Sequence, residues 1–332
     1  MTWRDQPAIE IQRRLRAFTQ GWSTEIQDAL FGNATRGTVG AMRFWQGAGE
    51  PYWIELPGIL VKAFARERDG IRGKNAFLRD VRWAQYCLYL AARIHDDIFD
   101  RGLPRSAFQP ISRKCEEEAS KVFRRCIGNN AKFSQFYREC VKSAKDAYKN
   151  VRHLRDPTVR TPRQILKGEY KRVSGVFKVG SAAVRARYER FLDFRRIEPG
   201  IEHLAVVGQI VDDVVDLEED LAAGQLNYVA RLFLGTRKTS ETDMGLLEQR
   251  IRSHFYFTDK VKRLSLELNR HLSLAAAAFE EARLDECQPI IDRYMKVLRT
   301  LETALQGRRS SYFLSLLCRD PDLNQKLTGL SK

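Results

Sequence analysis

The chain has 332 residues, of which 43% are hydrophobic and 30% charged, and its formal net charge is +15. These values are ordinary for a globular protein and exclude a disordered or fibrous chain. No apolar run approaches the roughly 20 residues that cross a bilayer, and the N-terminus is charged where a signal peptide is apolar. We therefore expect a cytoplasmic protein with no transmembrane segment. Because the six cysteines form no CxxC pair, we expect reduced thiols rather than a zinc site or a disulfide framework.

Apolar residues recur at helical spacing along the whole chain, and no alternating β-branched run closed by Asn-Gly or Asp-Gly is present. We therefore predict an all-α fold, an antiparallel helical bundle that forms a single domain over residues 1–332. The predicted helices are 6–30, 53–67, 75–101, 105–126, 131–153, 162–193, 198–222, 225–235, 240–254, 258–283 and 286–318. Gly and Pro mark breaks at 47–51, 102–104, 128–130, 156–157 and 199–200.

The third predicted helix ends in three aspartates. Residues 83–100 read WAQYCLYLAARIHDDIFD, which is apolar on nearly every side and then abruptly acidic. Asp96 and Asp100 are four positions apart and share a helix face, with Asp97 beside them. Three carboxylates at this spacing repel one another unless a cation neutralises them, and oxygen ligands favour Mg²⁺ or Ca²⁺.

A second acidic segment repeats this construction, because residues 203–220 read HLAVVGQIVDDVVDLEED. Its acidic residues are Asp212, Asp213, Asp216, Glu219 and Asp220. The aspartates at positions i, i+4 and i+8 of this set form one stripe, and the other two flank it. Gly208 and Gln209 lie a turn earlier on the same side, where they offer room for a substrate and an amide ligand. One such cluster is compatible with a solvated helix end, but two clusters on apolar helices favour a metal centre.

Two acidic helix ends that face each other across a bundle can hold several Mg²⁺ ions, which characteristically bridge protein carboxylates and substrate phosphates. The sequence has no Walker loop, kinase signature or Ser-His-Asp arrangement. The favoured reaction is therefore loss of diphosphate, which leaves a carbocation in an apolar pocket. Aromatic residues that can line this pocket are Phe99, Phe177, Tyr86, Tyr89 and Phe233, although aromatics at helical spacing are more often ordinary core.

These motifs resemble those of the class I isoprenoid synthases, and within them the trans-polyprenyl diphosphate synthases. HDDIFD at 95–100, followed by RGLP at 101–104, is similar to the first aspartate-rich motif of that family, and QIVDDVVD at 209–216 is similar to the second. KGEYKRVSGVFKVGSAAV at 167–184 resembles the helix whose lysine and small hydroxyl residue contact the diphosphate. The resemblance covers residues 50–235. It implies an isoprenoid synthase bundle with a central substrate cavity, a Mg²⁺ cofactor and a prenyl diphosphate substrate.

The resemblance also assigns roles to residues. The predicted metal ligands are Asp96, Asp97, Asp100, Asp212, Asp213, Asp216 and Asp220. All of them except Asp213 and Asp220 are also predicted to be catalytic. The predicted diphosphate-binding residues are Lys167, Lys171, Arg172, Arg308 and Tyr312, of which the last two resemble the diphosphate-sensing Arg-Tyr pair of terpene cyclases. On helix geometry, Ser174 and Lys178 share a face with the first two lysines of that set. The alternative, above all for Lys178, is an ordinary solvated stripe. We expect His95 to orient a neighbouring group or to pack, outside the site.

Departures from the family pattern leave the reaction open. Elongating synthases carry a basic Gly-Gly-Lys-Arg type motif before the first aspartates, whereas residues 46–53 read QGAGEPYW. Arg72 and Lys74 can substitute only at an atypical spacing, and the four residues usually found between the first cluster and its Arg-Gly are missing. The leading hypothesis is therefore a terpene synthase that ionises one all-trans prenyl diphosphate.

The alternative hypothesis is a prenyltransferase that either elongates a chain or joins two chains head to head. DLEEDLAAGQLNY at 216–228 resembles the DxxED region of squalene and phytoene synthases, while the aspartate stripe has the spacing of the cyclases' second metal motif. A third class, a basic helical protein that binds nucleic acid, is disfavoured because carboxylate clusters on apolar helices suit it poorly. We thus expect no nucleic-acid partner. Dimers are common in the family, so a homodimer is a further expectation.

Overall fold

The computed structural model describes residues 6–27, 51–64, 70–100, 102–150, 162–166, 171–188, 194–222, 224, 226–234, 244–257 and 259–319. Within these ranges the regular elements are helical and no strand occurs, which confirms the predicted all-α class. The helices are α1 (Gln6–Thr19), α2 (Thr24–Gln27), α4 (Tyr52–Phe64), α5 (Gly70–Asp100), α6 (Arg105–Ile127), α7 (Ala131–Asn150), α8 (Pro162–Gln164), α9 (Lys171–Arg187), α10 (Phe194–Val215), α11 (Leu217–Ala222), α12 (Tyr228–Leu234), α13 (Met244–Phe257), α14 (Lys260–Glu281) and α15 (Gln288–Arg319).

The largest error in the predicted boundaries concerns α10. Pro199 and Gly200 were expected to break the chain, but both lie inside this helix. Gly200 has a packing role instead, because a Cβ atom there would lie 2.9 Å from Cε1 of Phe279 on α14. The actual interruption falls at Asp216, between α10 and α11. The predicted helix 6–30 is likewise interrupted between α1 and α2.

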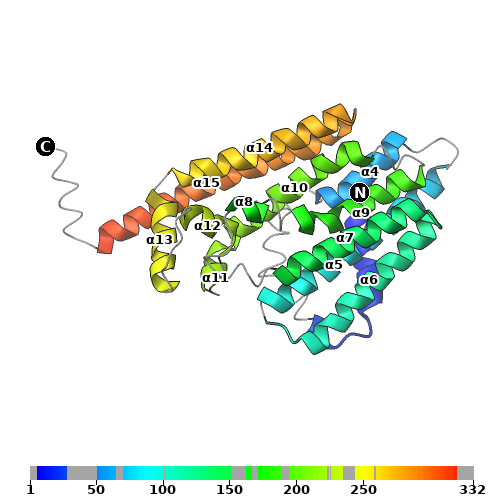
Figure 1. Cartoon of the computed structure of the whole chain (residues 1–332), viewed down its shortest axis with the longest axis horizontal. Helices are drawn as coiled ribbons and strands as arrows, with labels where there is room; N and C mark the ends of the chain where they lie inside the picture. The colour runs from blue at the N-terminus through cyan, green and yellow to red at the C-terminus, as the bar shows by residue number, and fades with distance from the viewer. Residues whose placement is uncertain are drawn as a thin grey trace.

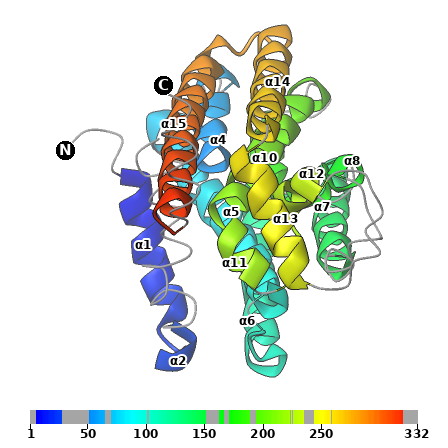
Figure 2. The same ribbon diagram turned by 90° about the vertical axis from the view of Figure 1, so that its left-hand side faces the viewer.

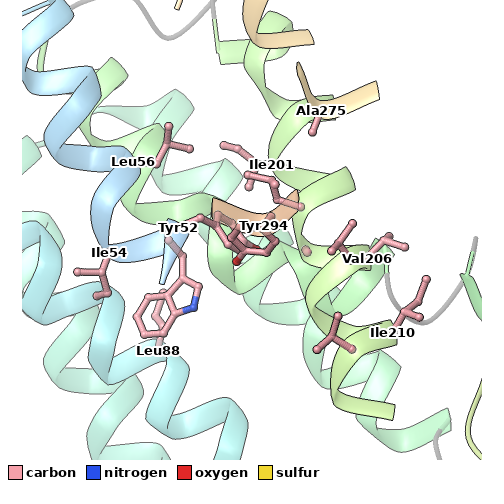
Figure 3. Packing of buried hydrophobic residues seen from close by; sticks show 14 of the residues in the cluster. Tyr52, Ile54, Leu56, Leu88, Ile201, Val206, Ile210, Ala275 and Tyr294 are labelled. Carbon is pink, nitrogen blue, oxygen red and sulfur yellow. The ribbon is translucent and has the colours of Figure 1, made fainter. Parts of the chain in front are cut away.

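One large cluster of buried apolar side chains draws residues from α4 through α15. Figure 3 shows part of it, where Tyr52 and Leu56 of α4, Ile201 of α10 and Tyr294 of α15 point into a shared interior. Each fully buried aliphatic or aromatic side chain of this kind stabilises the fold by roughly 1.5–3 kcal/mol relative to an exposed one. The bundle is therefore held together by packing between helices that are distant in the sequence.

The helices α9 and α10 connect the other helices of the bundle. α9 packs against α4, α5, α7 and α10, and α10 packs in turn against α14. α5 and α6 run beside each other, and α14 lies alongside α15 (Figures 1 and 2). This order places the acidic ends of α5 and α10 on helices that both contact α9.

Two further sequence expectations concern chemistry and membranes. The cysteines that the structure describes with their side chains, Cys87, Cys115, Cys126, Cys140 and Cys287, are all free thiols. Burial raises the pKa of Cys115 and of Cys140 to about 12, which keeps these thiols protonated and unreactive. Among the described residues no helix is both long and apolar enough to cross a membrane.

Candidate active site

The first acidic segment and the beginning of the second lie at the carboxyl ends of helices, whereas Glu219 and Asp220 lie in the first turn of α11. Asp96 and Asp97 are in the last turn of α5, and Asp212 and Asp213 are in the last turn of α10. The carboxyl end of a helix carries partial negative charge, so carboxylates there are unfavourable, whereas acidic caps belong at amino ends. For the four aspartates at the ends of α5 and α10, the placement therefore argues against simple capping and calls for a nearby cation.

The two segments share one electrostatic environment around Arg93. Its Nη1 and Nη2 atoms lie 3.4 Å from Asp96 Oδ2 and 3.4 Å from Asp97 Oδ1. Although burial disfavours the charged guanidinium, Asp96 and Asp97 raise the pKa of Arg93, and Asp212 of the second segment adds to this effect. The guanidinium thus interacts electrostatically with carboxylates from both helices, which indicates that the two acidic segments lie near each other.

The carboxylates of the second segment hold their protons unusually tightly. Burial raises the pKa of Asp212 to about 7, with repulsion from Asp216 and Asp96 adding to it and Arg93 opposing it. Burial also raises the pKa of Asp216 and of Asp220 to about 6, and Asp96 adds repulsion to both. A divalent cation bound near these carboxylates would reverse the shifts.

The helical spacing of the aspartate stripe survives the bend between α10 and α11. The backbone N–H of Asp216 donates to Asp212 O at 2.9 Å, and that of Asp220 donates to Asp216 O at 2.8 Å. The stripe at positions i, i+4 and i+8 is therefore continuous, as the sequence predicts.

Asn227 holds the second segment in place, and sequence reasoning missed it. Its Nδ2 donates to Asp220 Oδ2 at 2.7 Å and to Asp213 O at 2.9 Å. Its Oδ1 accepts the N–H of Ala230 at 2.9 Å, which is the N-cap bond of α12. An asparagine immediately before a helix was the available signal, but it indicates only a cap.

Asp213 has a different partner from the one predicted. Its Oδ2 accepts the N–H of Tyr228, the first residue of α12, at 2.8 Å. This contact directs the carboxylate toward the start of α12. Asp213 therefore joins α10 to α12 through one carboxylate oxygen, and its role as a metal ligand stays a prediction.

Open space lies beside the aspartate stripe. Gly208 is one turn before Asp212 on α10, and a Cβ atom added there would meet nothing within 4 Å. Gly208 and Gln209 both keep partial solvent access, although their neighbours Val207 and Ile210 are buried. The room that the sequence predicts at Gly208 is therefore present.

An aromatic cluster adjoins the acidic segments. Tyr89, one turn before Arg93, stacks on Trp53 of α4 at 4.8 Å between ring centroids. Phe177 of α9 lies 5.9 Å from Trp53 and 6.4 Å from Tyr89, and Tyr86 lies 6.2 Å from Tyr89. Burial raises the pKa of Tyr89 to about 12, so its hydroxyl stays neutral. Trp53 was not among the predicted pocket residues, because it lies in the segment that departs from the family motif.

Two other predicted residues have separate structural roles. Phe233 is fully buried and packs edge-on against Phe255 at 5.1 Å, so it belongs to the core and not to the aromatic cluster. His95 faces α6, where its Nε2 lies 3.8 Å from Glu116 Oε1, so the described partner of its ring belongs to neither acidic segment.

Lys178 is not part of a free basic face. Its Nζ donates to Glu198 Oε1 at 2.6 Å and to Glu202 Oε1 at 2.8 Å, both on α10. Burial opposes the charge, but the two carboxylates raise the pKa of Lys178 above its ordinary value. Lys178 therefore belongs neither to a basic face open to a diphosphate nor to a solvated stripe, because its ammonium group is held in this buried ion pair.

The remaining predicted site residues are described only in part. Lys167 lies outside the described residues, as do the side chains of Asp100, Lys171, Arg172, Arg308, Tyr312 and Phe99. The backbone still places one of these regions. Ala92 of α5 packs with Val176 of α9, and Gln85, earlier on α5, bonds to Gly180, later on α9. The two helices therefore run in opposite directions, which brings the Lys171 end of α9 level with Asp96.

The carboxylates alone do not form a closed metal cage. In the part of the chain that the structure describes, no group of three or more His, Cys, Asp or Glu side chains converges to hold an ion. Facing carboxylates that do not converge can hold Mg²⁺ when a phosphate group supplies the remaining oxygens, which is the usual way proteins bind this ion.

Comparisons with known proteins identify the fold. No protein-family model and no curated protein sequence matches the chain. Among solved structures, farnesyl pyrophosphate synthase of T. brucei superposes with a TM-score of 0.54 at 11% sequence identity, over 90% of this chain and 100% of that one. The chain therefore has the all-α isoprenoid synthase fold, as the sequence motifs predict.

Proposed function

We propose that this chain is a Mg²⁺-dependent enzyme that ionises an all-trans prenyl diphosphate with loss of diphosphate, acting as a terpene synthase. One observation carries the proposal, namely that the carboxylates of α5 and of α10–α11 are electrostatically coupled to one another and to Arg93, with an aromatic cluster beside them. The likeness in fold to a farnesyl pyrophosphate synthase supports prenyl diphosphates as the substrate class.

The donor set fits magnesium. Asp96, Asp97 and Asp100 would hold the ions from α5, and Asp212, Asp216 and Asp220 from the other side, all through carboxylate oxygens of the kind that Mg²⁺ prefers. Because these side chains do not converge on their own among the described residues, substrate phosphate oxygens would complete the coordination. When bound, Mg²⁺ supplies positive charge that stabilises the leaving diphosphate.

The chain's own residues would do the rest of the work. Arg93 offers a guanidinium between the two acidic segments, and the Lys171 end of α9 lies level with Asp96, so the proposed diphosphate contacts Lys171 and Arg172 belong there. The rings of Trp53, Tyr89 and Phe177 exclude water and present π faces, which stabilise a carbocation by about 0.5–2 kcal/mol each. We also place Arg308 and Tyr312 of α15 in the diphosphate-binding set, as the resemblance to cyclases suggests.

A prenyltransferase is the second candidate, and a specific observation favours it. The segment that resembles squalene and phytoene synthases, residues 216–228, is tied together by the contact of Asn227 with Asp220. That contact holds residues 220 and 227 together, and Asn227 is not part of the aspartate stripe whose spacing cyclases share. In this reading the same carboxylates release diphosphate, and the allylic cation is captured by a second isoprenoid.

Product analysis separates the two candidates. The purified chain is incubated with Mg²⁺ and geranyl, farnesyl or geranylgeranyl diphosphate, each with and without isopentenyl diphosphate. Hydrocarbon or alcohol formed from a single substrate supports a terpene synthase, whereas a longer diphosphate, or a head-to-head product from two allylic chains, supports a prenyltransferase. Absence of diphosphate release in every incubation, together with absence of Mg²⁺-dependent binding of inorganic diphosphate, would contradict both.

A further inference from the structure

The side-chain amide of Gln85 on α5 forms two hydrogen bonds with the backbone of α9. Gln85 is 0% exposed, its Nε2 donates to Val176 O at 2.8 Å, and its Oε1 accepts the N–H of Gly180 at 2.7 Å. In a regular α-helix the N–H of residue 180 would donate to the carbonyl of residue 176. Both ends of one helical hydrogen bond are therefore engaged by a single amide from another helix.

The contact requires the residues that surround it. A Cβ atom at Gly180 would lie 3.0 Å from Gln85 Oε1 and 3.3 Å from Pro57 Cγ of α4, so a larger residue would press on both neighbours. One turn earlier, a Cβ atom at Gly175 would lie 3.0 Å from Cys140 O of α7. α9 is thus fixed from two sides, by α5 at one glycine and by α7 at the other.

The position of this contact along the helices gives it functional weight. Because α5 and α9 run in opposite directions, a shift of α9 along its axis would move the Lys171 end past Asp96. Apolar packing tolerates small sliding, whereas a pair of hydrogen bonds of defined direction does not. Phe177, inside the bridged turn, is also the member of the aromatic cluster that α9 contributes.

We propose that Gln85 is a positioning residue that sets the register of α9 against α5, and thereby the location of the diphosphate-binding end of α9 and of Phe177. The inference rests on the proposed function and deepens it. Gln85 itself lies more than two helical turns before Asp96 on α5, so it acts through α9 and makes no contact with the substrate.

Two substitutions test this role. Gln85→Met keeps the length of the side chain and removes both hydrogen bonds. Gln85→Glu keeps the acceptor for Gly180, and it donates to Val176 O only when the carboxyl group is protonated. The matched control is Ser112→Ala. Ser112 of α6 is also buried, and its Oγ donates to Ala91 O of α5 at 3.2 Å, so it too bonds to α5 but not through α9.

The measurements are melting temperature, binding of inorganic diphosphate with Mg²⁺ by calorimetry, and product distribution. We expect Gln85→Met to weaken diphosphate binding about 10-fold or more, since small misplacements of binding groups cost up to about 100-fold. Ser112→Ala should lose stability without losing diphosphate affinity. Gln85→Glu should recover toward wild type as the pH falls from 8 to 6, because the neutral acid restores the missing donor. If Gln85→Met does not fold, the pH dependence of diphosphate binding by Gln85→Glu alone decides whether Gln85 has the positioning role.

The outcomes distinguish a failure of the proposed function from a failure of the role of Gln85. A wild-type chain that fails to bind inorganic diphosphate with Mg²⁺ would overturn the proposed function and the role of Gln85 with it. If the wild-type chain binds inorganic diphosphate, two results would overturn only the positioning role of Gln85. The first is that Gln85→Met binds diphosphate as tightly as wild type, and the second is that the affinity of Gln85→Glu relative to wild type does not change with pH.

Discussion

The two acidic segments carry their negative charge in different ways. Asp96 and Asp97 have a counter-ion on their own helix, because the Nη atoms of Arg93 lie 3.4 Å from each of their carboxylates. In the second segment burial and mutual repulsion dominate, and they raise the pKa of Asp212 to about 7. The α5 segment is therefore partly neutralised by direct contact with Arg93, whereas the α10–α11 segment depends more on protons or on an added cation.

The groups that hold the carboxylates in place also differ in charge between the two segments. The second segment is held by neutral groups, with Asn227 bonded to Asp220 and the Tyr228 N–H bonded to Asp213. Neutral donors fix the carboxylates without cancelling their full charge. A site that must attract Mg²⁺ together with an anionic diphosphate benefits from this asymmetry, since one side retains charge for the metal while the other offers a guanidinium.

The largest expected effect comes from removing one ligand from either segment. Asp212→Asn and Asp96→Asn should each reduce diphosphate release from a prenyl diphosphate by about 100-fold to 1,000-fold, as loss of a preorganised electrostatic group does elsewhere. The control is Glu218→Gln, an exposed carboxylate of α11 paired with Arg252 at 2.8 Å, which should change the rate little. A variant at Asp96 that released diphosphate at the wild-type rate would show that α5 is not part of the site.

Removing the internal counter-ion tests the asymmetry directly. Without Mg²⁺, Arg93→Gln should lower the free energy of unfolding by about 1–3 kcal/mol, less than for a fully buried pair because its side chain keeps 23% exposure. The rise in melting temperature on adding Mg²⁺ alone should exceed that of wild type, because the carboxylates lose their competing cation. Arg13→Gln, at an exposed ion pair with Glu10, is the control. An unchanged Mg²⁺ response would mean that the guanidinium does not compete with the metal.

The raised pKa of Asp212 predicts an unusual dependence of stability on pH. Its pKa is about 7 in the folded chain against an ordinary value of 3.8, so the unfolded chain loses the proton first as the pH rises. Wild-type stability without metal should therefore fall between about pH 4 and 7 through this group. Asp212→Asn removes this loss and should be more stable than wild type by about 1–2 kcal/mol above pH 7, a value reduced from the full shift because the carboxylate is partly exposed.

Melting curves of the two proteins in a chelator at pH 5 and pH 8 provide the measurement. The advantage of Asp212→Asn should be larger at pH 8 than at pH 5, and Mg²⁺ with inorganic diphosphate should stabilise only the wild-type chain. An equal difference at both values of pH would contradict the idea that charge on Asp212 opposes folding.

The parts of the site that follow local rules could be predicted from the sequence. Helical spacing placed Asp212, Asp216 and Asp220 on one stripe, and the backbone bonds between successive members confirm it. The same rule could not give the role of Lys178, because spacing shows which residues share a helix face but not what that face contacts. Its partners Glu198 and Glu202 lie on a different helix.

The remaining features depend on contacts between distant elements. Gln85 looks like any polar residue in an apolar helix until its two bonds to α9 are seen. Pro199 and Gly200 look like a helix boundary, although a continuous α10 accommodates both of them and uses Gly200 to approach Phe279. Tertiary packing decided each of these cases against the local signal.

Gly208 is the case in which sequence and structure agree on open space, and it predicts the smallest effect. Because a Cβ atom there meets nothing within 4 Å, Gly208→Ala should stabilise the chain by about 0.5–1 kcal/mol through helix propensity alone. Gly208→Leu should change stability little, but it should shift relative kcat/KM from geranylgeranyl toward geranyl diphosphate by about 3-fold to 10-fold, as one side chain's volume does in other pockets. Gly200→Ala is the control, since its Cβ atom would lie 2.9 Å from Phe279, which should lower the melting temperature without changing selectivity. Unchanged selectivity in Gly208→Leu would show that the prenyl chain does not pass beside Gly208.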